Sequence, residues 1–440
     1  MTALTVPPAT TPLDGEIHLP GDKSLSHRAA LFAAITTGES RIANFLDAGV
    51  TRPLLRALQN LSIPWELTGD VLTVHGRGLT GLPRPVTPPT LHCGHSATTM
   101  RLLAGFLAAA GLPAVLDGSP GLRRRPMRRI TAPLQAMGVP IEDTDGHAPL
   151  RLAARPAARP LRGLTYRLPV ASAQVKTALL LAALAADGPT TLTEPGPSRD
   201  HTERLFTAMG VPLSRPAPHT VRLTPPLPER LLPLRFTLPG DISSAAFLIV
   251  AALLVPGSRL TLRNVLLNPT RTGFLDAVAA MGARLTVTPL GKTYGEPFGD
   301  LTVEHTPGLH GITVGGDWVV RMVDEFPAFA IVAAAAQGET VVRDAAELRH
   351  KESDRIAAIV SRLQALGVAA EALPDGFRIR GGRRWRGGAL DAGGDHRIAM
   401  AFAVAGLAAE SPVTITDADI IAQSFPSFAA VLQACRTDQP

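Results

Sequence analysis

The stretch KTALLLAALAADGPTTL, residues 176–192, contains the pattern that decides the fold. An apolar run rich in Ala and Leu leads into a short break with glycine and then into a strand-like segment. The break residues of successive copies lie 69 to 81 residues apart, so six similar units fill the 440-residue chain. Self-similarity at a regular period indicates a repeat architecture. The other copies are HRAALFAAITTGESRI (27–42), MRLLAGFLAAAGLPAVL (100–116), AAFLIVAALLVPGSRLTL (245–262), FAIVAAAAQGETVVR (329–343) and MAFAVAGLAAESPVTI (400–415).

A second marker recurs in phase with the first. Four amphipathic stretches end in glycine, in QAMGVPI (Gly138), TAMGVPL (Gly210), AAMGARL (Gly282) and QALGVAA (Gly367). Glycine just past a helix end is typical of the left-handed residue that terminates a helix. Each unit therefore predicts a strand, a buried helix, a strand, an amphipathic helix and one or two further strands. The fold class is α/β.

Six such units could form one solenoid or two domains of three. The stretch 212–239 is rich in proline and falls between the third and fourth units, which makes it the best candidate boundary. We expect an N-terminal domain over residues 21–235 and a C-terminal domain over residues 236–440. The first 20 residues are expected to join the C-terminal domain.

Composition excludes several classes of protein. Hydrophobic residues make up 45%, as in a globular protein, and no apolar run approaches the roughly 20 residues that a bilayer span requires. Two cysteines and no basic segment leading into an apolar one predict a reducing, cytoplasmic location and no membrane association. The net charge of +6 comes from scattered arginines with few aromatics, which argues against nucleic-acid binding. The 43 basic residues include only four lysines: Lys23, Lys176, Lys292 and Lys351.

Polar residues gather directly before the buried helices. Asp and Ser are ordinary N-caps, but a Lys or Arg at a helix N-terminus opposes the helix dipole. A bound anion between the helix and the cation would explain that placement, and six such helix starts could face one cleft for small polyanions. The segments are PGDKSLSHR (20–28), CGHSATTMR (93–101), ASAQVK (171–176), PGDISSA (239–245), MVDEFP (322–327) and GGDHR (393–397).

Two further segments carry charge. LRRRPMRR, residues 122–129, predicts a turn or loop suited to binding carboxylate or phosphate. LRHKESDR, residues 348–355, is expected to open an amphipathic helix with Lys351 and Arg355 one turn apart and Glu352 beside them. Nucleotide and metal motifs are absent, so no cofactor and no metal is expected. Carboxylates among cations suit proton transfer during group transfer between phosphorylated or carboxylated small molecules.

These motifs, in their order, resemble the enolpyruvyl transferase family and, within it, the 5-enolpyruvylshikimate-3-phosphate synthases of the shikimate pathway. The resemblance spans nearly the whole chain and includes SRDHTE (198–203) and SFPSF (424–428). It implies an inside-out α/β barrel fold, with three βαβαββ repeats in each of two domains and the active site in the cleft between them. The implied reaction moves the enolpyruvyl group of phosphoenolpyruvate to the 5-hydroxyl of shikimate 3-phosphate and releases phosphate.

The resemblance also implies roles for residues of this chain. Asp324 would accept the hydroxyl proton, Glu352 would protonate the methylene carbon and later take a proton back, and Lys23 would contact both substrates. Shikimate 3-phosphate would be bound by Lys23, Ser24, Arg28, Ser172, Ala173, Gln174, Ser198, Arg199, Asp324 and Lys351. Phosphoenolpyruvate would be bound by Lys23, Ala97, Arg125, Gln174, Arg355 and Arg397.

Some positions depart from the family pattern. His95-Ser96-Ala97 stands where many members have Asn-Ala-Gly or Asn-Ser-Gly, and DADIIAQSFP lacks a lysine that many carry there. Alanine in place of that glycine resembles members that tolerate glyphosate, so weak inhibition is expected. The alternatives are the sister enzyme acting on UDP-N-acetylglucosamine, whose first motif has Lys-Asn, and a basic repeat protein that binds nucleic acid. We expect a monomer.

Overall fold

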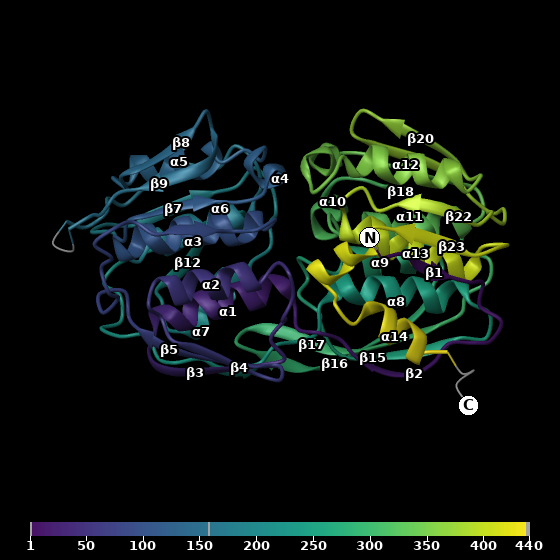
Figure 1. Cartoon of the computed structure of the whole chain (residues 1–440), viewed down its shortest axis with the longest axis horizontal. Coiled ribbons are helices and arrows are strands. Elements are labelled where there is room, and N and C mark those ends of the chain that lie inside the picture. The colour runs from purple at the N-terminus through teal and green to yellow at the C-terminus, as the bar shows by residue number, and fades with distance from the viewer. Residues whose placement is uncertain (1, 157–158, 437–440) are drawn as a thin grey trace. The chain divides into compact units, whose positions relative to one another are not determined.

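The computed structural model describes residues 2–156 and 159–436 and contains two compact units (Figure 1). The N-unit comprises residues 21–238 and 292–296, and the C-unit comprises residues 1–20, 239–291 and 297–440. Each unit holds three of the six repeats. Within each unit the helices lie inside and the strands outside, as Figure 1 shows.

A buried helix forms the centre of every repeat, and the prediction of six such helices is confirmed. Their side chains are buried nearly all round because the sequence is apolar on every face. The helices are α1 (Lys23–Ile35), α3 (Ala97–Ala110) and α6 (Ala173–Ala183) in the N-unit, and α8 (Ile242–Leu254), α11 (Phe326–Ala335) and α13 (His396–Ala405) in the C-unit. The strands that follow are β3 (Thr37–Ala43), β7 (Ala114–Asp117), β11 (Thr190–Thr193), β15 (Arg259–Leu266), β19 (Glu339–Val342) and β23 (Val413–Thr416).

Small residues let these helices pack closely. Helices α3 and α6 lie side by side (Figure 1). Gly105 of α3 faces the backbone of α6. A Cβ at Gly105 would lie 2.3 Å from the carbonyl oxygen of Ala178, which is far inside van der Waals contact. A residue larger than glycine at position 105 would therefore force α3 and α6 apart.

Each repeat also contains an amphipathic helix, which follows the buried helix in sequence. The four marker glycines have φ between 80° and 95°, which confirms their prediction as left-handed helix terminators. Ser62, with φ of 56°, takes this place after the first amphipathic helix. These helices are α2 (Arg52–Asn60), α5 (Arg128–Ala136), α7 (His201–Ala208), α9 (Gly273–Ala280), α12 (Arg355–Ala365) and α14 (Phe428–Ala434).

Six sheets occur within the described residues, and they share one topology. In every sheet the strand that follows a buried helix pairs in parallel with a lead strand, which in four of the six repeats is the strand directly before that helix. A hairpin completes each of the five four-stranded sheets. The lead strands of those four repeats are β6 (Thr90–His92), β10 (Thr165–Arg167), β18 (Thr313–Val314) and β22 (Gly388–Asp391). The hairpins are β4 (Trp65–Thr68) with β5 (Val71–Arg77), β8 (Ile141–Thr144) with β9 (His147–Leu152), β12 (Leu213–Ala217) with β13 (Thr220–Leu223), β16 (Arg284–Thr293) with β17 (Glu296–Glu304), and β20 (Ala369–Leu373) with β21 (Gly376–Arg380).

In the other two repeats, the strand that precedes the buried helix pairs in the sheet of a different repeat. Strand β2 (Asp14–His18) precedes α1 in sequence but pairs in parallel with β15 of the C-unit. Strand β14 (Arg235–Thr237) precedes α8 but pairs in parallel with β3 of the N-unit. The N-terminal strand β1 (Leu4–Val6) then pairs antiparallel with β23, where the last repeat has no hairpin of its own. Among the helices of the described residues, none is long and apolar enough to cross a membrane.

Candidate active site

The starts of the buried helices are capped as expected. A side-chain oxygen of the N-cap residue accepts a backbone N–H in five of the six, and only α11, which begins after Glu325, lacks such a bond. Cations then occupy first turns, as Lys23 does in α1 and Arg397 in α13. The five capping residues are Asp22, Ser96, Ser172, Asp241 and Asp395.

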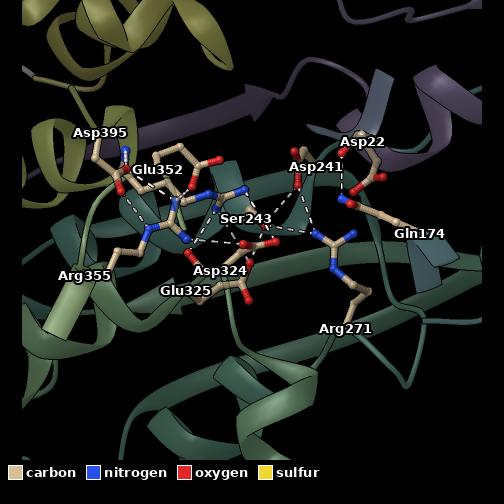
Figure 2. Close-up of polar contacts among 12 residues, drawn as sticks. Asp22, Gln174, Asp241, Ser243, Arg271, Asp324, Glu325, Glu352, Arg355 and Asp395 are labelled. Atoms are coloured by element: carbon tan, nitrogen blue, oxygen red, sulfur yellow. Dashed lines mark hydrogen bonds and ion pairs between the residues drawn. The ribbon is translucent and has the colours of Figure 1, made fainter. Parts of the chain in front are cut away.

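In the C-unit, one buried guanidinium contacts carboxylates from three segments of the chain (Figure 2). Arg355, only 1% exposed, donates from Nε to Asp395 Oδ2 at 2.8 Å and from Nη2 to Glu352 Oε2 at 2.7 Å. Its Nη1 lies 3.4 Å from Asp324 Oδ1. Asp395 is fully buried, and although burial opposes its ionisation, the Arg355 charge lowers the pKa of this carboxyl.

Asp324 and Glu352 are the partly accessible carboxylates of this cluster. Their side chains are 15% and 26% exposed, so both can meet a ligand. Arg397 donates to the Asp324 carbonyl oxygen at 3.1 Å, which ties the start of α13 to the segment before α11. Lys351 is half-buried. Burial lowers the pKa of its ammonium, and the nearby charge of Asp324, which acts to raise that pKa, offsets only part of this effect. The cluster therefore combines two reachable carboxylates with three cations.

In the N-unit, Arg28 connects the starts of α1 and α6. It is 2% exposed and donates to the Ser24 carbonyl oxygen at 3.0 Å, to Thr177 Oγ1 at 2.8 Å and to Thr202 Oγ1 at 2.9 Å. Burial lowers the pKa of Arg28 to about 10, so the guanidinium remains charged at neutral pH. Arg28 thus holds Ser24 in place through its backbone.

A second group in the N-unit joins α3 to α6. Arg101 donates from Nη1 to Gln174 Oε1 at 2.6 Å, and Gln174 donates in turn to Thr98 Oγ1 at 2.8 Å. Arg101 also donates to the Pro126 carbonyl oxygen at 3.1 Å, beside the partly exposed Arg125. Ala97 is the first residue of α3 and is 3% exposed. These contacts bring three separate sequence motifs together.

Two expectations about local structure were wrong. Residues 348–355 do not open one helix, because a 3₁₀ turn (Ala346–His350) ends before Lys351 and α12 begins only at Arg355. Asp354 imposes this start by accepting the Ala357 N–H, so Lys351 and Arg355 are not one helical turn apart. Residues 122–129 are only partly a loop, since α4 (Pro120–Arg123) and α5 contain both ends. The Ser119 hydroxyl caps α4 by accepting the Leu122 N–H.

Comparisons with known proteins agree across the chain. Residues 7–432 match the family model for EPSP synthase (3-phosphoshikimate 1-carboxyvinyltransferase). A 3-phosphoshikimate 1-carboxyvinyltransferase of Roseiflexus sp. strain RS-1 is 49% identical over 422 residues, covering 96% of each chain. One from Coxiella burnetii strain RSA 493 is 48% identical over 418 residues, covering 94% of this chain and 93% of its own.

This chain belongs to the EPSP synthase family. The structure of an EPSP synthase from Acinetobacter baumannii superposes with a TM-score of 0.87 at 38% identity and covers 99% of this chain and 98% of its own. An enolpyruvyl transferase from Streptomyces tendae, at 20% identity and a TM-score of 0.78, shares the fold over 98% of this chain and 97% of its own. The predicted family and fold are thereby confirmed.

Family membership makes this chain a transferase of the shikimate pathway. The match favours this branch of the enolpyruvyl transferases over the one that acts on UDP-N-acetylglucosamine. Within residues 2–156 and 159–436, no group of three His, Cys, Asp or Glu side chains could hold a metal ion.

Sequence reasoning missed several EPSP synthase residues that organise these clusters. Asp395 was recognised only as an N-cap, because its spacing from Arg355 in the sequence gives no sign that the two residues pair. Arg101 closes the CGHSATTMR motif, and its place in that motif was the available signal. Arg271, 1% exposed and donating to Ser243 Oγ at 2.9 Å, lies in no motif that sequence reasoning singled out, so only the structure reveals it.

The buried imidazole of His27 in this EPSP synthase should make stability depend on pH. Its Nδ1 donates to the Lys23 carbonyl oxygen at 2.8 Å, while Nε2 lies 3.1 Å from Thr99 Oγ1. Burial lowers the pKa of His27 to about 4, so the unfolded chain takes up a proton at a higher pH than the folded chain does. The stability from neutral His27 is therefore present above pH 6.5 and lost as the pH falls to about 4, by about 3 kcal/mol.

Melting temperatures from pH 7 to pH 4 check this prediction. The variant His27→Gln should lose less stability than wild type over that range. His75→Gln, at an exposed position, should keep the wild-type pH dependence. Equal slopes for His27→Gln and wild type would show that another group is responsible.

Proposed function

We propose that Asp324 and Glu352 perform the proton transfers by which this enzyme moves the enolpyruvyl group of phosphoenolpyruvate to the 5-hydroxyl of shikimate 3-phosphate. The observation that carries the proposal is that both carboxylates contact the guanidinium of Arg355 while remaining partly exposed. The shared cation holds the two carboxylates close together. A base and an acid can then act on the same pair of substrates.

The steps follow from the chemistry of the two substrates. Asp324 takes the proton of the 5-hydroxyl as its oxygen attacks C2 of phosphoenolpyruvate, while Glu352 donates a proton to the methylene carbon. The result is a tetrahedral ketal with a new methyl group. Glu352 then removes a proton from that methyl as the C–O bond to phosphate breaks, which restores the double bond. The leaving phosphate takes the proton held by Asp324, so both carboxyl groups return to their starting states.

Cations contributed by both units would stabilise the charge of the two substrates. We propose that Lys23, Arg125, Arg355 and Arg397 bind the carboxylate and phosphate of phosphoenolpyruvate, with Ala97 and Gln174 completing that pocket. Lys351 binds shikimate 3-phosphate near the reacting hydroxyl. Several cations are needed because two polyanions repel each other strongly outside bulk water. The remaining residues proposed for shikimate 3-phosphate are Lys23, Ser24, Arg28, Ser172, Ala173, Gln174, Ser198, Arg199 and Asp324.

Phosphate release in the presence of each substrate alone and of both together tests the function. We expect release only with both, and a fall in kcat of about 100-fold for Asp324→Asn, because general bases contribute at least that much. Asp317→Asn, at an exposed position of the C-unit, is the matched control and should retain wild-type kcat. Wild-type activity in Asp324→Asn would refute the proposed base.

Ala97 is predicted to weaken inhibition by glyphosate. It is the first residue of α3 and is 3% exposed, so its methyl group has little room to move away from a longer inhibitor. Ala97→Gly should lower the inhibition constant at least about tenfold, since one methyl group in a tight pocket is worth that much. Ala110→Gly, at the other end of α3, should leave inhibition unchanged. Sub-micromolar inhibition of the wild type, competitive with phosphoenolpyruvate, would contradict this prediction.

We also propose that the enzyme acts as a monomer in the cytoplasm. Composition supports this location, since the chain has two cysteines, both buried and free. Sedimentation at micromolar concentration tests the oligomeric state. A mass near 46.2 kDa is expected.

A further inference from the structure

Lys176 is a buried charge that the proposed reaction does not use. Its side chain is 5% exposed, and its Nζ lies 2.7 Å from Glu194 Oε2 and 2.7 Å from Glu203 Oε1. Both carboxylates are buried as well. Burying three charges in helix α6 and its neighbours costs several kcal/mol for each ion before pairing, and apolar residues would usually serve packing better. The arrangement therefore calls for a functional reason.

Glu194 supplies that reason, because it also holds two serines. It follows strand β11 directly, and its Oε1 accepts the backbone N–H of Ser172 at 3.1 Å. Its Oε2 accepts the hydroxyl of Ser198 at 2.9 Å. Ser172 is the N-cap of α6, and its own Oγ accepts the Val175 N–H. The hydroxyl hydrogen of Ser172 thus remains available for an anion.

We propose that Lys176, Glu194 and Glu203 form a positioning triad that orients Ser172 and Ser198 toward the phosphate of shikimate 3-phosphate. The inference rests on the proposed role of these two serines. Ser198 has a single hydroxyl hydrogen, which it gives to Glu194 in this structure. To bind phosphate it must redirect that hydrogen. Lys176 makes this possible, since its ammonium satisfies the Glu194 oxygen that the hydroxyl leaves.

Lys176 also screens the substrate from the carboxylates. Burial would lower the pKa of Lys176, but Glu203 and Glu194 outweigh burial and raise it, so the ammonium is charged at neutral pH. Without that charge, Glu194 would stand within hydrogen-bond reach of both serines as an uncompensated anion. It would then repel a phosphate dianion bound to them. Affinity for the phosphorylated substrate should therefore depend on Lys176, and affinity for its unphosphorylated counterpart should not.

Calorimetric titration of the full-length protein with shikimate 3-phosphate and with shikimate tests the proposal. In Lys176→Met the dissociation constant for shikimate 3-phosphate should rise at least about tenfold, whereas that for shikimate should stay within about twofold. Lys176→Arg should recover much of the loss because it restores the charge. Lys292→Met, which removes an exposed lysine of the same unit, should match wild type for both ligands.

The possible outcomes distinguish the proposed role of the triad from a merely structural role of Lys176. They also distinguish failure of this proposal from failure of the proposed function. An unchanged dissociation constant for shikimate 3-phosphate in Lys176→Met, or equal losses for both ligands, would overturn the triad's role. The double variant Lys176→Met/Glu194→Gln should bind shikimate 3-phosphate more tightly than Lys176→Met, since it removes the uncompensated charge. If Lys176→Met does not fold, Glu194→Gln decides, and unchanged binding of shikimate 3-phosphate there overturns the proposal. Absence of shikimate 3-phosphate binding in wild type would instead refute the proposed function.

Discussion

Replacing Glu352 with glutamine is expected to lower kcat by about 1,000-fold or more. Glutamine keeps the size of the side chain and an oxygen for Arg355, but it has no proton to give to the methylene carbon. Loss of a general acid that also serves as the base of the second step should approach the upper range for such groups. Phosphate release with both substrates at saturation measures the effect.

Deuterium incorporation provides a second test of the proton transfers proposed for Glu352. A proton delivered by Glu352 and one later removed from a freely rotating methyl group need not be the same atom. Turnover in heavy water should therefore place deuterium in the vinyl group of the product with wild type, and much more slowly with Glu352→Gln. Glu410→Gln, which alters an exposed carboxylate of the C-unit, should behave as wild type in both assays. Full activity of Glu352→Gln would exclude the proposed acid.

Removing the guanidinium of Arg355 should have the largest effect on stability. Arg355→Met leaves Asp395 fully buried and unpaired and frees Glu352 and Asp324 from their shared cation. Breaking a buried ion pair by removing one partner costs about 3–5 kcal/mol. Activity should also disappear, because Arg355 is proposed to bind phosphoenolpyruvate and orients both reacting carboxylates.

Thermal and denaturant unfolding, followed with phosphate release, measure this prediction. Arg380→Met is the matched control, because Arg380 pairs with Glu339 at 3.2 Å while its side chain is 76% exposed. Exposed pairs contribute at most about 1 kcal/mol, so the control should be nearly as stable as wild type. A loss of stability in Arg355→Met no larger than in Arg380→Met would show that Asp395 does not depend on Arg355.

Particular residues show how far sequence reasoning reached into the site. Lys23, Ser172 and Arg397 could be placed at helix starts because capping is a local property of a few consecutive residues. Partners that are distant in sequence could not be placed in this way. Arg355 is an example, because its partner Asp395 lies 40 positions along the chain in another repeat. Residues 348–355 illustrate the opposite error, since a helical pattern there was overruled by the Asp354 cap and by contacts of Arg355 with distant carboxylates.

The sequence by itself determined the six repeats, the buried helices, the glycines that end the outer helices and the position of charge at helix starts. Apolar periodicity and backbone conformational preference act over short stretches, so they can be read one unit at a time. Only the tertiary structure decided which strands are exchanged, which carboxylates share Arg355, and that Lys176 pairs with Glu194 and Glu203. Those outcomes depend on pairing between distant segments, where the cost of burying a charge is met by a partner that no local pattern specifies.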